Sequence, residues 1–345
     1  MTILVRPAQY ESDSRELVRV LQTNLPYLPH ALLFEWLYLR NPEGQALAWV
    51  AEDSESNRII GVAAAFPRRM YCCGEEARGY VLGDFCIHPG HRSLGLALAL
   101  QRALLDGLST ADADFAFDFP SRTMLAVYKR LRIEANGALI RHAKPLRADR
   151  KVAEQVPVRA VARGLSAVAN ASLRLRDATV RRSGDWTIVV EAGPWGEEFT
   201  QAAREWSPSM GICVARTADY LNWRYREHPN RRYEMLSARQ NGELRGYLIQ
   251  HMDGEDCTID DLLAKEDGVC NALLVEAIAV ARKNRVHTLS APWLSTHQGR
   301  RLLEKCGFRP RESSPVVLLT LPAASRSQNG EAKGGWYLTA GDWES

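Results

Sequence analysis

The 345-residue sequence lacks long apolar runs, and this predicts that no segment of it crosses a membrane. Runs such as Gly61 to Phe66 are far shorter than the ~20 residues that a transmembrane helix needs. The stretch from Met1 to Tyr10 has no basic region followed by an apolar one, so we expect no secretory signal peptide. The cytoplasm is therefore the expected compartment.

Cysteines are few and show no pattern that suggests pairing. The seven are odd in number and have no C-x-x-C spacing, which predicts free, mostly buried thiols and excludes a disulfide framework or a cysteine zinc site. His88 and His91 lie close together but have no third ligand nearby, so we expect no metal. Hydrophobic residues make up 46% and charged residues 25% of the chain, which is ordinary for a globular protein long enough for two domains.

Positive charge is concentrated in one segment. The whole chain has a net charge of +3, yet residues 141–182 contain eleven Lys or Arg against three acids, Asp149, Glu154 and Asp177. The basic character therefore describes a connector and not the whole surface. Within it, Val158 to Arg176 has apolar residues near helical spacing with arginines between them. This segment suits a helix that bridges two domains, which we prefer, or one that binds an anionic membrane surface or nucleic acid.

A short frame, W-x-Y-x-x-x-P, occurs twice, at Trp36 to Pro42 and at Trp223 to Pro229. The same order of predicted elements surrounds both copies: a strand, a helix, the frame, three strands, a long helix, a strand and a closing helix. The sequence therefore predicts an α+β protein of two tandem domains, each with a mixed, mostly antiparallel sheet flanked by helices. We place the first domain at residues 1–142, the connector at 143–184, the second domain at 185–322 and a tail at 323–345.

The clearest motif in the first half begins at Arg92, after a predicted strand that ends near Ile87. Arg92-Ser93-Leu94-Gly95-Leu96-Ala97 matches [Q/R]-x-x-G-x-[G/A] and leads into a strongly apolar predicted helix, Leu94 to Leu108. The first backbone amides of a helix lack internal partners and attract anions, and the glycine allows close approach of a phosphate. The motif favours a pyrophosphate site, although a plain loop before a buried helix would also fit it.

With this motif, the sequence resembles the GNAT superfamily of acyl-CoA-dependent N-acyltransferases over roughly Ile3 to Ile133, and the resemblance implies two tandem GNAT-like domains. It implies that the amides of Arg92, Ser93, Leu94, Gly95, Leu96 and Ala97 bind the pyrophosphate of acetyl-CoA or another acyl-CoA. It also implies that the backbone of Phe85, Cys86 and Ile87 holds the pantetheine and thioester. The family's L-x-x-Y motif is matched by Leu125 to Tyr128, and Arg132-Ile133 stands where the family usually has Gly-Phe.

Amine acylation needs a base for the ammonium and an acid for the departing thiolate. The resemblance gives Tyr128 the role of acid, and its alternative is to pack the helix against the sheet. Asp84, within the apolar run VLGDFCI, is the candidate base, or else a carboxylate that orders a loop or binds the amine. Glu35 is a further candidate for the acceptor pocket, although we expect it to be exposed.

The second half has lost the motif. Glu266 and Asp267 stand where the first half has its phosphate loop, and acids there repel a phosphate. Leu303 replaces the tyrosine, although Gly307-Phe308 is present. We therefore expect a degenerate copy in which Asp260, Asp261, Arg224 and Arg226 have structural roles or line an acceptor pocket. Trp336 and Tyr337, in an aromatic stretch near the end, are expected to dock onto the body.

The resemblance implies N-acyl transfer from an acyl-CoA, with acetyl-CoA as the expected donor, to a small-molecule primary amine, and an amino sugar is one candidate by analogy. Two alternatives remain: an aminoacyl or longer-acyl transferase, and a non-catalytic acyl-CoA-binding sensor or scaffold. Nucleic acid is a less favoured partner, because only the connector is basic.

Overall fold

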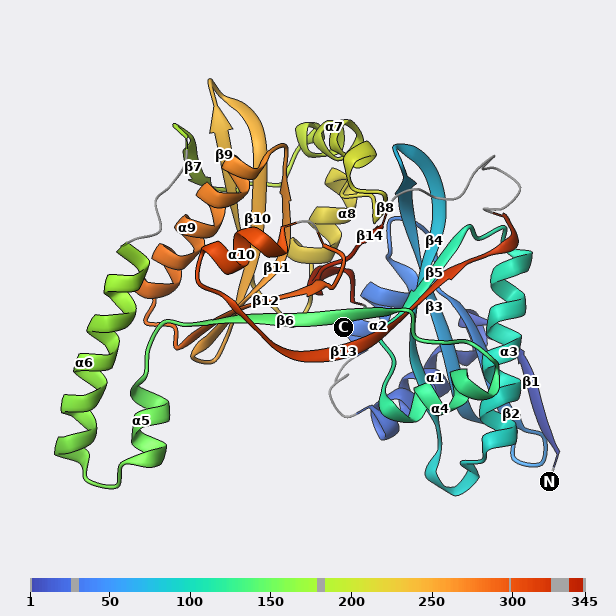
Figure 1. Ribbon diagram of the computed structural model, residues 1–345. Coiled ribbons are helices and arrows are strands. Elements are labelled where there is room, and N and C mark those ends of the chain that lie inside the picture. Colours follow the sequence, from blue (N-terminus) through green and yellow to red (C-terminus); the bar gives the residue numbers. More distant parts are fainter. Residues whose placement is uncertain (1, 26–30, 179–183, 298, 324–334, 344–345) are drawn as a thin grey trace.

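The computed structural model describes residues 2–25, 31–178, 184–297, 299–323 and 335–343, and the chain forms two α+β halves joined along a shared sheet (Figure 1). The strands of the first half are β1 (Ile3–Pro7), β2 (Leu47–Asp53), β3 (Arg58–Cys72), β4 (Glu75–Ile87), β5 (Phe115–Asp118) and β6 (Gly137–Pro145). Its helices are α1 (Tyr10–Asn24), α2 (Ala31–Phe34), the π-helical turn η1 (Glu35–Leu39), the 3-10 turn η2 (Pro89–His91), α3 (Leu94–Thr110) and α4 (Arg122–Arg130).

The second half repeats the order. Its strands are β7 (Thr187–Val190), β8 (Ile212–Val214), β9 (Tyr233–Gln240), β10 (Glu243–Asp253), β11 (Asp256–Ala264), β12 (Thr288–Leu294) and β13 (Arg309–Thr320). Its helices are α7 (Glu197–Trp206), η3 (Ser207–Ser209), α8 (Ala218–Leu221), the π-helical turn η4 (Asn222–Arg226), α9 (Asp267–Lys283) and α10 (Arg300–Lys305). The connector forms α5 (Asp149–Gln155) and α6 (Arg159–Ala178), and the tail forms β14 (Trp336–Tyr337) and η5 (Ala340–Asp342). The predicted α+β class and the repeated plan are confirmed.

Hydrophobic spacing explains why the two long helices form where they do. In α3, Leu96, Leu100, Leu104 and Leu108 recur every four residues and are buried against the sheet. The helix comes so close to β2 that a Cβ on Gly107 would lie 1.9 Å from the Trp49 ring, so only glycine fits there. In the second half, α9 is buried on more than one side, because it packs on β9, β10 and β11 and against α10.

The two halves exchange strands. Along the sheet the order is β1-β2-β3-β4-β5-β13-β6-β12-β11-β10-β9-β7. Thus β13, from the end of the second half, pairs with β5 of the first, while β6 of the first half pairs with β12 of the second. β13 and β6 also pair with each other between these contacts. Residue 142, where the sequence suggested a boundary, lies within β6, and the sheet is continuous there.

The two W-x-Y frames contact each other across the interface between the halves. Trp36 and Trp223 stack with ring centroids 4.5 Å apart and planes inclined by 17°. Each indole donates to the other's backbone: Trp36 Nε1 to the carbonyl of Trp223 at 3.0 Å, and Trp223 Nε1 to that of Trp36 at 3.1 Å. Both residues belong to one hydrophobic core with members from both halves. The repeated frame is therefore a reciprocal contact between the two copies.

The missing Gly-Phe of the first half does not change its closing turn. Arg132 takes the left-handed conformation with φ 61°, as Gly307 does in the second half with φ 89°. In both turns the next amide bonds back to the helix, Ile133 N to Tyr128 O at 2.9 Å and Phe308 N to Leu303 O at 3.0 Å. Arg132 thus adopts a conformation that favours glycine, at an energetic cost.

The expectations for the connector, thiols and membrane segments have separate outcomes. The sequence favoured a helix that bridges the two domains. Figure 1 instead places α6 beside α9 on the outer side of the second half, away from the interface between the halves. All seven cysteines fall within the described residues, are free, and are buried except Cys73. In the described part of the chain, no helix is long and apolar enough to span a bilayer.

Candidate functional site

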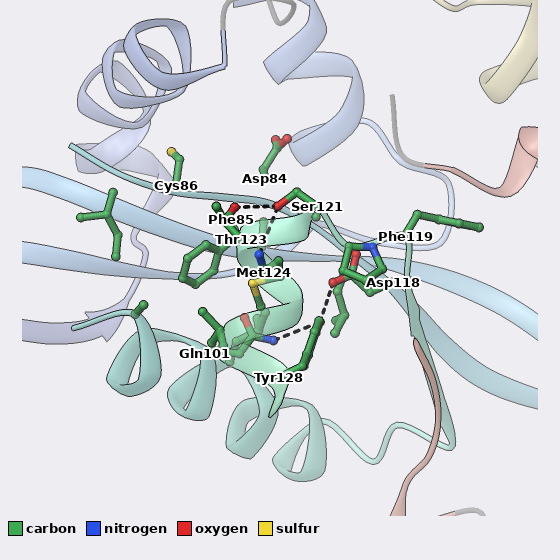
Figure 2. Close-up of a pocket in the computed structure, with 18 of the residues that line it drawn as sticks. Asp84, Phe85, Cys86, Gln101, Asp118, Phe119, Ser121, Thr123, Met124 and Tyr128 are labelled. Atoms are coloured by element: carbon green, nitrogen blue, oxygen red, sulfur yellow. Dashed lines mark hydrogen bonds between the residues drawn. The ribbon is translucent and has the colours of Figure 1, made fainter. Parts of the chain in front are cut away.

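A cavity of about 780 Å³ opens in the first half where β4 and β5 separate. The two strands are parallel and pair only from Gly79 to Leu82 with Phe115 to Asp118. Beyond Leu82, the cavity lies between the end of β4 and the loop that leads into α4, with α3 alongside (Figure 2). Its lining includes the following sequence-predicted residues: Asp84, Phe85, Cys86, Ile87, Arg92, Ser93, Leu94, Ala97 and Tyr128.

The start of α3 forms one end of the cavity. Ser93 caps the helix, with its hydroxyl accepting from Leu96 N at 3.2 Å and its carbonyl accepting from Ala97 N at 3.1 Å. Gly95 and Leu96 are not among the residues that line the cavity, but the position that a Cβ of Gly95 would take is open, with no atom of the rest of the fold within 4 Å. Leu96 is buried and anchors the first turn to the core. The first amides of α3 therefore lie beside open space that suits an anion.

Arg92 ties the loop to β4. Its Nε donates to Ile87 O at 3.0 Å, and its Nη2 donates to Asn24 Oδ1 at 3.2 Å. On the other edge, β4 pairs with β3, Cys86 opposite Val62. The segment from Asp84 to Ile87 thus has one edge in the sheet while its other edge is not paired with β5, which leaves backbone groups directed toward the cavity.

Asp84 lies at a bulge in β4, with φ 48°. It is buried and accepts a 2.7 Å hydrogen bond from the Tyr38 hydroxyl. Burial raises the pKa of Asp84 to about 6, and the bond from Tyr38 acts in the opposite direction. Tyr38 is the tyrosine of the first W-x-Y frame, so the frame orients the candidate base, a role that the sequence did not suggest.

Tyr128 lies in a second buried pair. Its hydroxyl donates to Asp118 Oδ2 at 2.5 Å and accepts from Gln101 Nε2 at 3.5 Å (Figure 2). Burial raises the pKa of Asp118 to about 7, while the bond from Tyr128 lowers it. Asp118 and Gln101 were missed from the sequence. For Asp118 the available signal was a lone carboxylate in the apolar run FAFDFP, the same kind of setting as that of Asp84.

Other sequence candidates lie away from this cavity. Glu35 was expected to be exposed but is only partly exposed, and it pairs with Arg40 at 2.6 Å. His88 accepts from Gly90 N through its Nδ1, with its ring 5.6 Å from that of His91. Among the described residues, no group of three or more metal-ligating side chains is close enough to hold an ion.

The tail of the chain also reaches the cavity. Trp343 lines it, with a ring centroid 5.6 Å from that of Phe119. Buried Arg224 holds the tail, donating to Gly341 O at 3.0 Å and to Trp343 O at 2.8 Å. Trp336 and Tyr337 dock as β14 alongside β8, as expected. A residue of the second W-x-Y frame therefore positions a wall of the first half's cavity.

In the second half, the tail fills the corresponding separation between β11 and β12. Those strands pair only from Asp256 to Thr258. Beyond that point, Leu294 N donates to Leu338 O at 3.0 Å, and the Tyr337 hydroxyl donates to Leu262 O on the opposite strand. The space that forms a cavity in the first half is here occupied by the chain itself.

Charged residues of the second half hold this tail. Arg216 pairs with Asp261 at 3.2 Å and with Asp342 at 2.8 Å, and all three are buried. Asp260 bonds His251 at 2.5 Å. At the start of α9, Glu266 is the N-cap and Asp267 lies in the first turn. These contacts favour the structural roles over an acceptor pocket.

Comparisons with known proteins agree with this geometry. Residues 5–132 match the model of the acetyltransferase (GNAT) domain. No curated protein matches the chain. Among solved structures, a probable N-acyltransferase of unknown function from Enterococcus faecalis has a TM-score of 0.67 at 13% identity, covering 94% of this chain and 74% of that one.

Two further structures share the fold. Eis1 from Mycobacterium abscessus has a TM-score of 0.62 at 15% identity, covering 94% of this chain and 74% of that one. The N-myristoyltransferase of Saccharomyces cerevisiae, solved with bound myristoyl-CoA, has a TM-score of 0.58 at 11% identity and covers 92% and 82%. At these identities the likeness concerns the fold of both halves. The family match identifies residues 5–132 as an acetyltransferase (GNAT) domain, and the structural likeness shows that the chain shares the fold of these proteins across both of its halves.

Proposed function

We propose that this protein transfers an acetyl group from acetyl-CoA to a primary amine by direct attack of the amine on the thioester in a ternary complex. One observation carries the proposal: the start of α3, the bulged end of β4 and Tyr128 line a single cavity. The proposed acyl-CoA unit is residues 1–142, completed by β13 from the proposed second unit at 185–322. Residues 143–184 and 323–345 are the proposed connector and tail.

Acyl-CoA binding is assigned to the loop and the strand end. Within the predicted loop, Arg92 to Ala97, the amides ahead of Leu96 would receive the pyrophosphate, because those of Leu96 and Ala97 already bond to Ser93. The open space at the Cβ position of Gly95 supports this placement. The backbone of Phe85, Cys86 and Ile87 would hold the pantetheine arm and the thioester, because the β5-facing edge of this segment has no strand partner in the described sheet. Simultaneous binding of both substrates supplies the orientation that the reaction needs.

The chemical step needs three proton transfers: two from the amine nitrogen and one to the departing thiolate. Asp84, directly or through one water, accepts the proton that the ammonium loses, and a carboxylate with a pKa of about 6 is largely ionised and basic enough near neutral pH. The amine nitrogen then bonds to the thioester carbonyl carbon, and the positively charged nitrogen of this adduct loses its second proton to water. When the carbon–sulfur bond breaks, Tyr128 gives its proton to the CoA thiolate. Asp118, hydrogen-bonded to Tyr128, is placed to return a proton to it.

The second half is assigned a supporting role. Its own groove is filled by the tail, and its α9 starts with two carboxylates. Through Arg224 it places Trp343 beside Phe119, so we assign these two aromatic rings to the acceptor side of the cavity. The acceptor is proposed to be a small amine, and an amino sugar is the first one to test.

The test is product formation. The protein is incubated with acetyl-CoA and a panel of primary amines that includes glucosamine, and acetylated products are detected by mass spectrometry. Tyr128→Phe and Asp84→Asn keep the shape of the cavity and are expected to lower kcat by ~10²–10⁴-fold, the usual contribution of general acid–base catalysis. Their affinity for acetyl-CoA, measured by calorimetry, should stay near that of the wild type.

Other outcomes point to the alternatives. If products form only with longer acyl-CoA or aminoacyl donors, the acyl donor is one of these and not acetyl-CoA. Binding of acetyl-CoA with no acylated product from any amine, and no effect of Tyr128→Phe, would favour a sensor or scaffold.

A further inference from the structure

Helix α6 exposes an apolar stripe to solvent. The stripe residues are Val158, Val161, Leu165, Val168 and Leu175, with exposed fractions of 57%, 51%, 49%, 71% and 71%. Val158 directly precedes α6, and its carbonyl accepts from Ala162 N at 2.9 Å. The five residues follow one another in steps of three, four, three and seven, so they form one stripe along the helix. Ala160, Gly164, Ala167 and Ala171 are exposed beside them. This face is larger and more continuous than the scattered apolar residues of an ordinary surface.

The opposite face of α6 is fixed to the protein. Ala162 and Ser166 are buried. The Asn170 side chain accepts from Ala148 N at 2.8 Å and donates to Asp149 at 3.2 Å, which ties α6 to α5. Asp177 pairs with Lys144 at 2.5 Å and also with Arg282 of α9. Rolling the stripe onto the body would break these contacts, so the stripe stays exposed.

The exposed charges of α6 are all positive, and the neighbouring α5 adds exposed Arg150 and Lys151 against one exposed acid, Glu154. Arg159, Arg163, Arg174 and Arg176 are exposed on α6, and the sequence has no acid between Arg159 and Arg176. Asp177, the acid that follows, is engaged by Lys144. A second copy packed stripe to stripe in antiparallel fashion would set the arginines at one end of α6 against those at the other end of its partner. The exposed face offers no acid to offset that repulsion.

We propose that the α6 stripe binds the surface of an anionic lipid bilayer. Its valines and leucines would enter the boundary between headgroups and acyl chains, and its arginines would reach the lipid phosphates. Figure 1 shows α5 and α6 projecting beyond the second half, so a flat surface can meet the helix without meeting the rest of the protein. A nucleic acid would use the arginines but would leave the apolar stripe in water.

The test is co-sedimentation of the full-length protein with lipid vesicles. We expect binding to vesicles that contain 30% phosphatidylglycerol, weak binding to pure phosphatidylcholine, and loss of binding at high salt. Leu165→Glu combined with Val168→Glu should abolish binding, while Leu4→Glu, at an exposed residue of β1, should not. Arg163→Gln combined with Arg174→Gln should lower the partition coefficient about 25-fold, since each basic residue near an anionic surface contributes about fivefold.

Thermal unfolding of each variant shows whether it is folded, and it does not depend on any catalytic assignment. Three results would overturn the proposal: no binding to either type of vesicle, binding that survives the Leu165 and Val168 changes in folded protein, or a stable dimer in light scattering that these changes dissociate. A fourth result would assign the arginines to nucleic acid instead. In that case the wild type would bind a DNA duplex and not vesicles, and the Leu165→Glu, Val168→Glu variant would bind the duplex with the same affinity.

Discussion

A single substitution, Gly95→Glu, separates cofactor binding from folding. It should lower the affinity for acetyl-CoA and raise the free energy of unfolding. Nothing lies within 4 Å of the Cβ position at Gly95, so the new side chain enters the open space at the start of α3 without displacing the fold. If a pyrophosphate binds there, the carboxylate comes close to it. Two like charges 4 Å apart near a protein surface repel by ~4 kcal/mol, which corresponds to about a 10³-fold weaker affinity for acetyl-CoA.

The same change should stabilise the protein. Replacing a helical glycine lowers the conformational cost of α3, and an acid in the first turn interacts favourably with the helix dipole, together giving a gain of ~1 kcal/mol in the free energy of unfolding. Calorimetry with acetyl-CoA and denaturant unfolding measure the two quantities.

Two control variants define the cause. Gly95→Ala adds a methyl group and no charge, so it should bind acetyl-CoA more tightly than Gly95→Glu. Gly196→Glu puts the same charge at the N-cap of α7, where the Cβ position is also open, and should leave binding unchanged. Undiminished affinity in folded Gly95→Glu would refute the placement of the pyrophosphate at α3.

Four further predictions concern the site and the interface between the halves. Burial raises the pKa of Asp118 to about 7 from 3.8, so ionising it costs stability; the free energy of unfolding of the wild type should fall between about pH 4 and pH 7 relative to Asp118→Asn, by on the order of a few kcal/mol, and parallel pH-dependent unfolding curves for the two proteins would contradict this. Tyr38→Phe removes the donor that lowers the pKa of Asp84, so the acidic limb of the pH–rate profile should move to higher pH by up to ~1 unit; an unmoved limb would exclude Asp84 as the base. Trp36→Ala should lower the free energy of unfolding by ~3–5 kcal/mol, and a double-mutant cycle with Trp223→Ala should show a coupling of ~0.5–3 kcal/mol, with simple additivity as the contrary result. Trp343→Ala should raise the KM for the amine about tenfold and leave acetyl-CoA affinity unchanged, with Trp343→Phe near wild type; a change in acetyl-CoA affinity alone would move Trp343 to the cofactor side.

Local patterns in the sequence predict most of the elements but not their partners. The leucines of α3 and the apolar run VLGDFCI of β4 are visible in the sequence, and so is the loop at Arg92, because each depends on neighbours a few residues away. The pairing of β13 with β5 depends on residues about 200 positions apart, and no local signal specifies it. The same limit applies to the hydrogen bond between Tyr38 and Asp84: the sequence shows both residues, while the contact depends on the folded sheet.

Backbone conformation was the other unpredictable feature. The Arg132 turn has the same shape as the Gly307 turn, although its sequence departs from the family pattern. The hydrogen bond from Ile133 N to the carbonyl of buried Tyr128 closes this turn and holds Arg132 in the left-handed region. Such contacts outweigh the ~1–2 kcal/mol by which a residue with a side chain disfavours that conformation.

The exchange of β6 and β13 has a consequence for synthesis. During translation, β5 emerges long before β13, so the sheet that carries Asp118 keeps an open edge until residue 320 has been made. Contacts of such long sequence separation form slowly and leave strand edges exposed to aggregation in the interval. The half that carries the catalytic candidates is therefore finished last, and a chain that stops after the first half would lack a strand of its own acyl-transfer domain.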